Sequence, residues 1–227
     1  MKNTRTNNSI KNSIASLVVY ILNILMTFLM QSVFIRNLGA EYNGVKGLFT
    51  NILSMLSIAE LGFGSAIVYN LYRPMAEKKE DEIKTLVNFY KNVYHIVAGV
   101  TLAIGIVLLP VVPYIVGEVS IPENIKLLFM LYLLNTVASY LLTYKRSVLY
   151  ADQKNYVTNI VSSIMIVLKN IVQILIICLT KNFILFLICQ IAFTILENII
   201  INNIVRARYK YIIDMKNLPV NNAQRNL

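Results

Sequence analysis

Residues 157–180 read VTNIVSSIMIVLKNIVQILIICLT, an apolar run long enough for a membrane helix, since a bilayer core takes about 20 such residues. Lys169 lies near the middle of this run. A cation at that depth costs roughly 2.5–3.5 kcal/mol on insertion scales, so it requires a wet or paired environment. At about 100° per residue, the polar residues of the segment fall within about 60° of one another. They are Thr158, Ser162, Lys169, Gln173 and Thr180. This pattern predicts a helix with one polar side that lines a hydrophilic space.

The composition points to a membrane protein. Hydrophobic residues make up 57% of the chain and charged residues 14%, which is too apolar for an ordinary soluble domain. The net charge of +10 does not indicate a nucleic-acid partner, because the basic residues form short clusters between apolar runs and no nucleic-acid module is recognisable. Cys178 and Cys189 lie in apolar surroundings without metal-ligand spacing. We therefore predict an all-α integral membrane protein without a metal or cofactor.

Six apolar segments are long enough to span a bilayer. We expect spans at Ser13–Ile35, Leu48–Tyr72, Val93–Val116, Ile125–Tyr144, Val157–Thr180 and Phe183–Val205. Turn-forming residues separate them: Gly39 and Gly44, Pro74, Gly117 with Pro122, and Lys181 with Asn182. Pro110 and Pro113 should kink or loosen the end of the third span. The expected organisation is an N-terminal segment, 1–12, a six-helix bundle, 13–205, and a polar tail, 206–227.

The distribution of Lys and Arg predicts the orientation of the bundle. Most of these residues lie in the N-terminal segment, the second and fourth connections and the tail. The first, third and fifth connections and their flanks hold only Arg36, Lys46, Lys126 and Lys181. Basic residues are enriched on the cytoplasmic side, so both termini should be cytoplasmic. No small-residue cleavage site follows the first apolar run, which therefore reads as an uncleaved span.

An amphipathic stretch, Glu80–Tyr94, precedes the third span. Its apolar residues recur at helical spacing, so we expect it to lie along the cytoplasmic interface and to lead into that span. For residues 77–84 alone, a solvated charged loop is the favoured interpretation.

Polar residues also follow one face of four other spans. The stripes are Ser16, Tyr20, Asn23, Thr27 and Gln31 in the first; Thr50, Ser57, Glu60 and Gly64 in the second; Tyr132, Asn135, Ser139 and Thr143 in the fourth; and Gln190, Thr194 and Glu197 in the sixth. Such residues often bond neighbouring helices. Five stripes with three ionisable groups favour a shared hydrophilic cavity, in which Lys169 would pair with Glu60 or Glu197. Such a pair is either structural or serves anion capture or ion coupling.

Three stretches resemble a known family. They are residues 40–66, AEYNGVKGLFTNILSMLSIAELGFGSA; residues 70–78, NLYRPMAEK; and residues 139–156, SYLLTYKRSVLYADQKNY. The chain from about residue 13 to residue 214 is similar to the polysaccharide-transport branch of the multidrug, oligosaccharidyl-lipid and polysaccharide exporter superfamily. These bacterial proteins flip lipid-linked repeat units of O-antigen, capsule and related glycans.

The resemblance implies a fold and a site. Members of the family have two six-helix lobes around a central cavity. Cationic groups in that cavity engage the pyrophosphate or acidic sugars of an undecaprenyl-linked glycan. Lys169 is the matching candidate by position, and Arg36 is a weaker one. With the polar stripes, the candidate cavity residues are Lys169, Glu60, Glu197, Gln173, Asn23, Gln31 and Arg36.

The chain departs from the family pattern by containing one six-helix bundle. We expect an N-terminal half that is truncated, or one that pairs with another bundle or with a second copy of itself. The expected setting is the bacterial cytoplasmic membrane, with membrane lipid and the lipid-linked glycan as partners. A non-transporting subunit that docks glycan-synthesis partners is the alternative. A membrane enzyme is disfavoured, because the outer loops offer only Glu41, Glu118 and Glu123 and no His.

Overall fold

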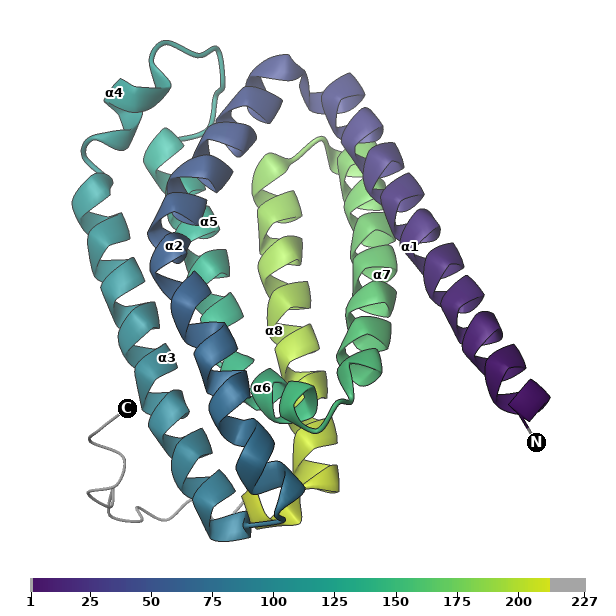
Figure 1. The fold of residues 1–227 in the computed structure, drawn as a ribbon. Coiled ribbons are helices and arrows are strands. Elements are labelled where there is room, and N and C mark those ends of the chain that lie inside the picture. The colour runs from purple at the N-terminus through teal and green to yellow at the C-terminus, as the bar shows by residue number, and fades with distance from the viewer. Residues whose placement is uncertain (1, 213–227) are drawn as a thin grey trace.

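The computed structural model describes residues 2–212 of the chain, and the side chains of residues 17, 20–56 and 64–212. These residues form helices and no strand (Figure 1). The elements are α1 Lys2–Leu38, α2 Ala40–Ala76, α3 Glu80–Leu108, α4 Val112–Val116, α5 Ile125–Tyr140, α6 Thr143–Ala151, α7 Asn155–Thr180, α8 Phe183–Arg208 and a 3-10 turn, η1, at Lys210–Ile212.

Long apolar helices confirm the expected fold class. Within the described residues, five segments are long and apolar enough to cross a membrane. They are Tyr20–Leu38, Glu80–Leu108, Ile125–Ala151, Asn155–Thr180 and Phe183–Arg208. The third of these comprises α5 and α6. The 37-residue α2 is a sixth long helix, although the side chains of residues 57–63 lie outside the description. The protein is an all-α, multi-pass membrane bundle.

The turn residues act as the sequence suggests at most positions. Gly39 separates α1 from α2 with φ 100°, a conformation that favours glycine, and its amide donates to the Ile35 carbonyl at 2.9 Å. The α3 helix ends at Leu108, before Pro110, and the chain makes the short α4 before entering α5. Asn182 caps α8 by accepting from the Leu185 amide at 3.0 Å. Gly44 and Pro74, in contrast, lie inside α2.

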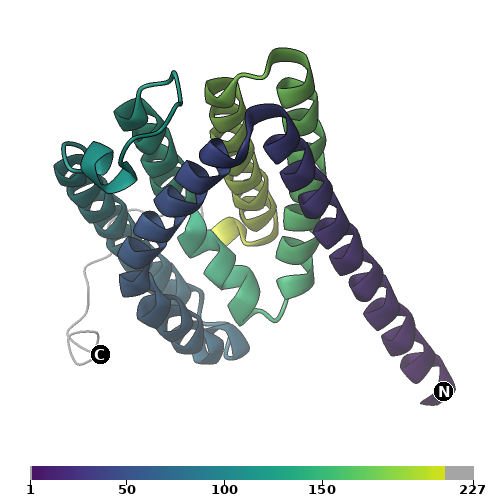
Figure 2. The ribbon, with the colours of Figure 1, turned by 90° about the horizontal axis from the view of Figure 1, so that it is seen from above.

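The helices alternate in direction between two ends of the bundle (Figure 1). One end, called the basic end here, holds the α2–α3 turn, the α6–α7 turn and the last turn of α8. The opposite end holds the α1–α2 turn, the α4–α5 loop and the α7–α8 turn. The start of α1 lies on the side of the basic end, but this helix projects away from the other helices there (Figure 2). It is tied to α7, and Asn23 Nδ2 donates to Ser163 Oγ at 3.0 Å.

Three expectations about the basic end need correction. Residues 80–94 do not lie along the interface, because α3 runs without a break from Glu80 to Leu108. Their apolar side chains are buried against other helices, and Glu80–Lys84 are helical rather than a solvated loop. Lys145 and Arg146 are likewise not in a connection, since they belong to α6 and turn into the bundle.

The buried apolar residues form two clusters, one at each end of the bundle. The basic-end cluster joins α2, α3, α6 and α8 and includes Leu71, Val87, Val148 and Val205. The opposite-end cluster joins α1, α2, α5, α7 and α8 and includes Phe34, Phe49, Phe129, Phe183 and Phe186. Polar side chains lie on the segments between the two clusters. We call this set of side chains the polar midsection: Thr50, Ser54, Asn135, Thr136, Ser139, Thr143, Arg146, Ser162, Lys169, Gln190, Thr194, Glu197 and Asn198.

Candidate functional site

Two adjoining clefts open into the polar midsection. The first has a volume of about 310 Å³ and lies between α2, α5 and α8, with Thr50, Asn135 and Gln190 in its lining. The second has a volume of about 520 Å³ and extends along α2, α3 and α6 to Arg146. Both are lined by Ser139 and Tyr140, so they form one polar path toward the basic end. Members of the polar stripes line these clefts: Thr50 and Gly64 of the second span, Tyr132, Asn135, Ser139 and Thr143 of the fourth, and Gln190 of the sixth.

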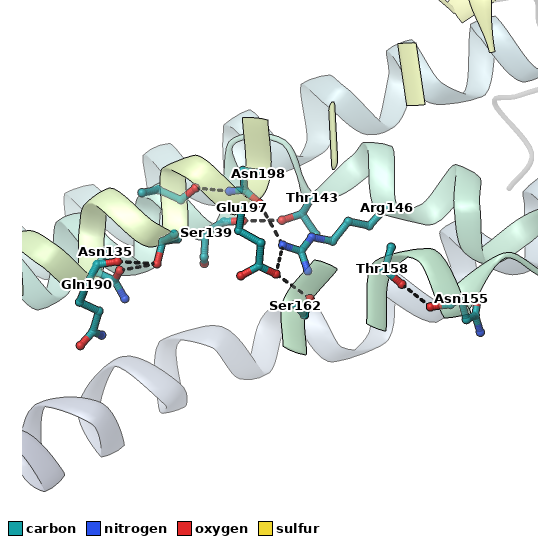
Figure 3. Close-up of polar contacts among 12 residues, drawn as sticks. Asn135, Ser139, Thr143, Arg146, Asn155, Thr158, Ser162, Gln190, Glu197 and Asn198 are labelled. Carbon is teal, nitrogen blue, oxygen red and sulfur yellow. Dashed lines mark hydrogen bonds and ion pairs between the residues drawn. The ribbon is translucent and has the colours of Figure 1, made fainter. Parts of the chain in front are cut away.

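Arg146 and Glu197 form an ion pair in this midsection (Figure 3). Arg146 Nη2 donates to Glu197 Oε1 at 2.8 Å, and the same oxygen accepts from Ser162 Oγ at 2.6 Å. Arg146 also donates to Asn198 Oδ1 at 3.2 Å, while Asn198 Nδ2 donates to the Ala138 carbonyl at 2.9 Å. Both charged side chains are only about one fifth exposed. Three helices, α6, α7 and α8, thus converge on one carboxylate.

A break between α5 and α6 places Arg146 there. The α5 helix ends at Tyr140, and α6 begins at Thr143 after Leu141 and Leu142. The Thr143 hydroxyl donates back to the Ser139 carbonyl, which satisfies an acceptor at the end of α5. The short α6 then presents Tyr144, Val148 and Leu149 to the basic-end cluster and Arg146 to α8.

Lys169 lies in the midsection, half-buried on α7, without an ion pair among the described residues. The expected pair with Glu197 is absent, because Glu197 is bound by Arg146, although Glu197 remains near enough to attract the lysine. A second cation, Lys46 on α2, lies close enough for the two ammonium groups to repel each other. Neither lysine forms an ion pair among the described residues.

Lys46 is held by polar and aromatic groups rather than by a carboxylate. Its Nζ donates to Gln31 Oε1 at 2.8 Å and lies 4.8 Å from the Phe34 ring centroid and 5.9 Å from that of Phe186. Gln31 in turn donates to the Asn43 side chain. Cation–π contacts and amide bonds hold a lysine without neutralising it, so its charge remains available to an anion.

Three further candidates bond neighbouring helices. Gln173 is buried and donates to the Phe186 carbonyl at 3.3 Å, which joins α7 to α8. Asn23 joins α1 to α7, and Gln31 joins α1 to α2. These residues follow the packing interpretation of polar residues in membrane helices.

Two candidates do not take part in the described cluster. Arg36 is exposed in the last turn of α1. The Glu60 side chain lies outside the described residues, so its pairing with Lys169 stays a prediction.

The two basic residues of the site that the sequence reading missed are Arg146 and Lys46. The sequence pattern places both in connections, because each follows or precedes an apolar run. The signal for Arg146 is the amphipathic pattern of residues 143–151, whose apolar members recur at helical spacing. The signal for Lys46 is its distance from Gly39, about two helical turns, which places it inside the following helix.

Tyr132 adds an unsatisfied group to the first cleft. It is 5% exposed, it lines the cleft, and its hydroxyl has no hydrogen-bond partner among the described residues. A buried hydroxyl without a partner is costly, so this position favours a polar ligand or water. Taken together, the midsection offers amide and hydroxyl groups to a polar solute, while Lys169 within it and Lys46 next to it offer two unneutralised ammonium groups to an anion.

Comparison of the chain with known proteins finds no match to a family model, to a curated protein or to a solved structure.

Proposed function

We propose that this chain is one lobe of a bacterial exporter that flips lipid-linked oligosaccharide repeat units across the cytoplasmic membrane. The observation that carries the proposal is the placement of two lysines at the polar midsection, Lys169 within it and Lys46 next to it, with no carboxylate in an ion pair with either ammonium group among the described residues. A lipid-linked glycan has matching parts: an anionic diphosphate, a hydroxyl-rich saccharide and an apolar tail.

Each part of such a ligand has a chemically suitable surface. The diphosphate would lie between Lys46 and Lys169, because charge-assisted hydrogen bonds from lysine are the strong contacts available to phosphate. Sugar hydroxyls would bond to Thr50, Asn135 and Gln190 in the first cleft. The polyprenyl tail would remain in lipid against the exposed apolar side of α1. Flipping needs binding and conformational exchange rather than a covalent step.

The proposed orientation places the basic end in the cytoplasm, following the bias of Lys and Arg. The midsection then lies at membrane depth between the two apolar clusters. A second lobe, either another bundle or a second copy of this chain, would close the open side of the site.

Binding of an undecaprenyl-diphosphate disaccharide to the purified chain in nanodiscs tests the proposal. Lys169→Met and Lys46→Met should each weaken binding about tenfold, since a bond to a charged group is worth about 1.5–3 kcal/mol. Lys181→Met, the loss of one exposed charge at the opposite end, is the matched control and should leave binding unchanged. Equal affinities for all four proteins would refute the assignment of the cations.

Transport is separated from binding in proteoliposomes. A fluorescent lipid-linked glycan in the outer leaflet is bleached by an impermeant reductant, and a flippase should protect a fraction of it. Retained affinity without protection would indicate a binding subunit that does not transport.

A further inference from the structure

Lys145 is a buried cation at the basic end that the proposed transport site does not use. Lys145 is only 5% exposed. It belongs to α6, near the end of the candidate span Ile125–Ala151. Its ammonium donates to the side-chain carbonyl of Asn202 on α8 and lies 5.8 Å from the Tyr144 ring centroid. An amide oxygen and a ring face do not neutralise it, and no carboxylate forms an ion pair with it in the described part of the chain.

Two more cations lie near Lys145. Arg206 on α8 lies one helical turn after Asn202, the partner of Lys145, and Lys91 on α3 follows Tyr90, which is buried in the same cluster as Tyr144. The charges of both oppose that of Lys145. The three helices pack together here, with Tyr144, Tyr90 and Val205 in one buried cluster. Lys91 is half-buried and Arg206 is exposed, so these three basic side chains can be reached from the surface of the bundle.

Most of the described carboxylates of the basic end have other partners. Asp152 is paired with Lys154, and Glu197 with Arg146. At the α2–α3 turn, Glu77, Asp81 and Glu82 are paired with Arg73, Lys79 and Lys84. Glu80 is exposed at the start of α3, about three helical turns before Lys91. Three neighbouring cations without a paired carboxylate leave a positive site that an external anion would stabilise.

We propose that Lys91, Lys145 and Arg206 hold the phosphate of an anionic phospholipid headgroup at the basic end of the bundle. This site is separate from the transport site and does not depend on it. A phosphodiester fits because one negative charge and its free oxygens bond to several basic side chains together. The position favours a lipid over a free phosphate: α8 is ending at Arg206, where a span meets the headgroup region, and basic residues there attract anionic lipids.

Native mass spectrometry of the purified full chain tests the site. The probes are phosphatidylglycerol and phosphatidylcholine with the same acyl chains. The wild-type chain should prefer phosphatidylglycerol, and Arg206→Gln, Lys91→Gln and Lys145→Met should each weaken that binding about fivefold, as expected for one basic contact near a membrane surface. Lys126→Gln removes one charge at the opposite end and should bind phosphatidylglycerol like wild type.

If Lys145→Met does not fold, the variants at the exposed Arg206 and the half-buried Lys91 still decide the test. Phosphatidylglycerol affinity for Arg206→Gln and Lys91→Gln equal to that of Lys126→Gln would overturn the proposal. Displacement of phosphatidylglycerol by millimolar inorganic phosphate would also overturn it and would assign the site to a free anion. No preference for phosphatidylglycerol in wild type would show that Lys145 is held there without an anion.

Discussion

At the scale of single residues, Arg146 and Glu197 carry opposite charges in a place where most neighbours are uncharged. Each is about one fifth exposed, so water screens the pair only in part. Removal of one partner leaves the other charge uncompensated, which costs about 3–5 kcal/mol for a fully buried pair. The remaining exposure lowers the cost here.

We therefore predict that Arg146→Met or Glu197→Gln lowers the unfolding free energy by about 2 kcal/mol. The double variant should be less destabilised than the sum of the two, because neither charge is then left alone. Denaturation in detergent measures this. Arg73→Met, which breaks the exposed pair with Glu77, is the control and should leave the unfolding free energy close to that of wild type. Additive effects at positions 146 and 197 would show that the ion pair has no energetic coupling.

A second residue-scale prediction concerns Asp152 in the α6–α7 turn. Burial raises the pKa of Asp152, but hydrogen bonds from Lys154 and Tyr209 and the charges of Lys154 and Arg208 outweigh it and hold that pKa below its usual 3.8. A carboxyl with a lowered pKa in the folded state stabilises the fold above the unfolded pKa, and this contribution is lost as the pH falls through the folded pKa.

The Asp152→Asn variant should therefore unfold at a lower temperature than wild type at pH 7, and the difference should shrink below about pH 4. Thermal unfolding from pH 7 to pH 3 measures the difference. A gap between the two proteins that is the same at every pH would contradict the role of the carboxylate charge.

At the scale of helices, Gly105 sets how closely α3 approaches α5. A Cβ built on Gly105 would lie 2.4 Å from both Cδ atoms of Leu133, a side chain that is fully buried. Gly99, on the same helix, has nothing within 4 Å of an added Cβ.

We predict that Gly105→Ala destabilises the bundle by about 1–3 kcal/mol through overpacking. Leu133→Val in the same chain should recover part of that loss, because it removes a methylene from the contact. Gly99→Ala should be neutral or stabilising, since alanine is the better helix former by about 1 kcal/mol. Thermal unfolding of the four proteins decides; equal effects at positions 99 and 105 would contradict the close approach.

The helices themselves could be predicted because their apolar runs have the length that a bilayer requires. The last two spans match α7 and α8 within a few residues, and Gly39 and Lys181 mark turns. The α5–α6 break could not be foreseen, because Leu141 and Leu142 carry no breaking signal. The site was harder to predict from the sequence than the helices. A polar stripe identifies the polar face of one helix, but the partner of Glu197 depends on how α6 packs against α8.

At the scale of the whole molecule, the bundle is held at its two ends and is polar between them. Phe34 is fully buried in the opposite-end cluster, with ring centroids 5.5 Å from Phe183 and 5.2 Å from Phe186. Phe28, on the same helix, is 67% exposed and faces away from the cluster.

Phe34→Ala should therefore lower the unfolding free energy by about 2 kcal/mol, less than in a soluble core because lipid rather than water replaces the lost contacts. Phe28→Ala should have little effect, and so should Ser139→Ala in the midsection. Unfolding in detergent, with the three variants measured side by side, tests this division. A loss at Ser139 as large as that at Phe34 would show that the midsection also secures the fold.

The separation of two apolar clusters from a polar midsection has a consequence for descent. Substitutions of the hydroxyl and amide side chains of the midsection would leave the apolar packing at the two ends in place, provided that the Arg146–Glu197 ion pair is kept. A lineage with this plan can retain one architecture while the polar groups that line its clefts diverge. Selection on assembly and selection on the lining of the clefts would then act on largely different residues of the same helices.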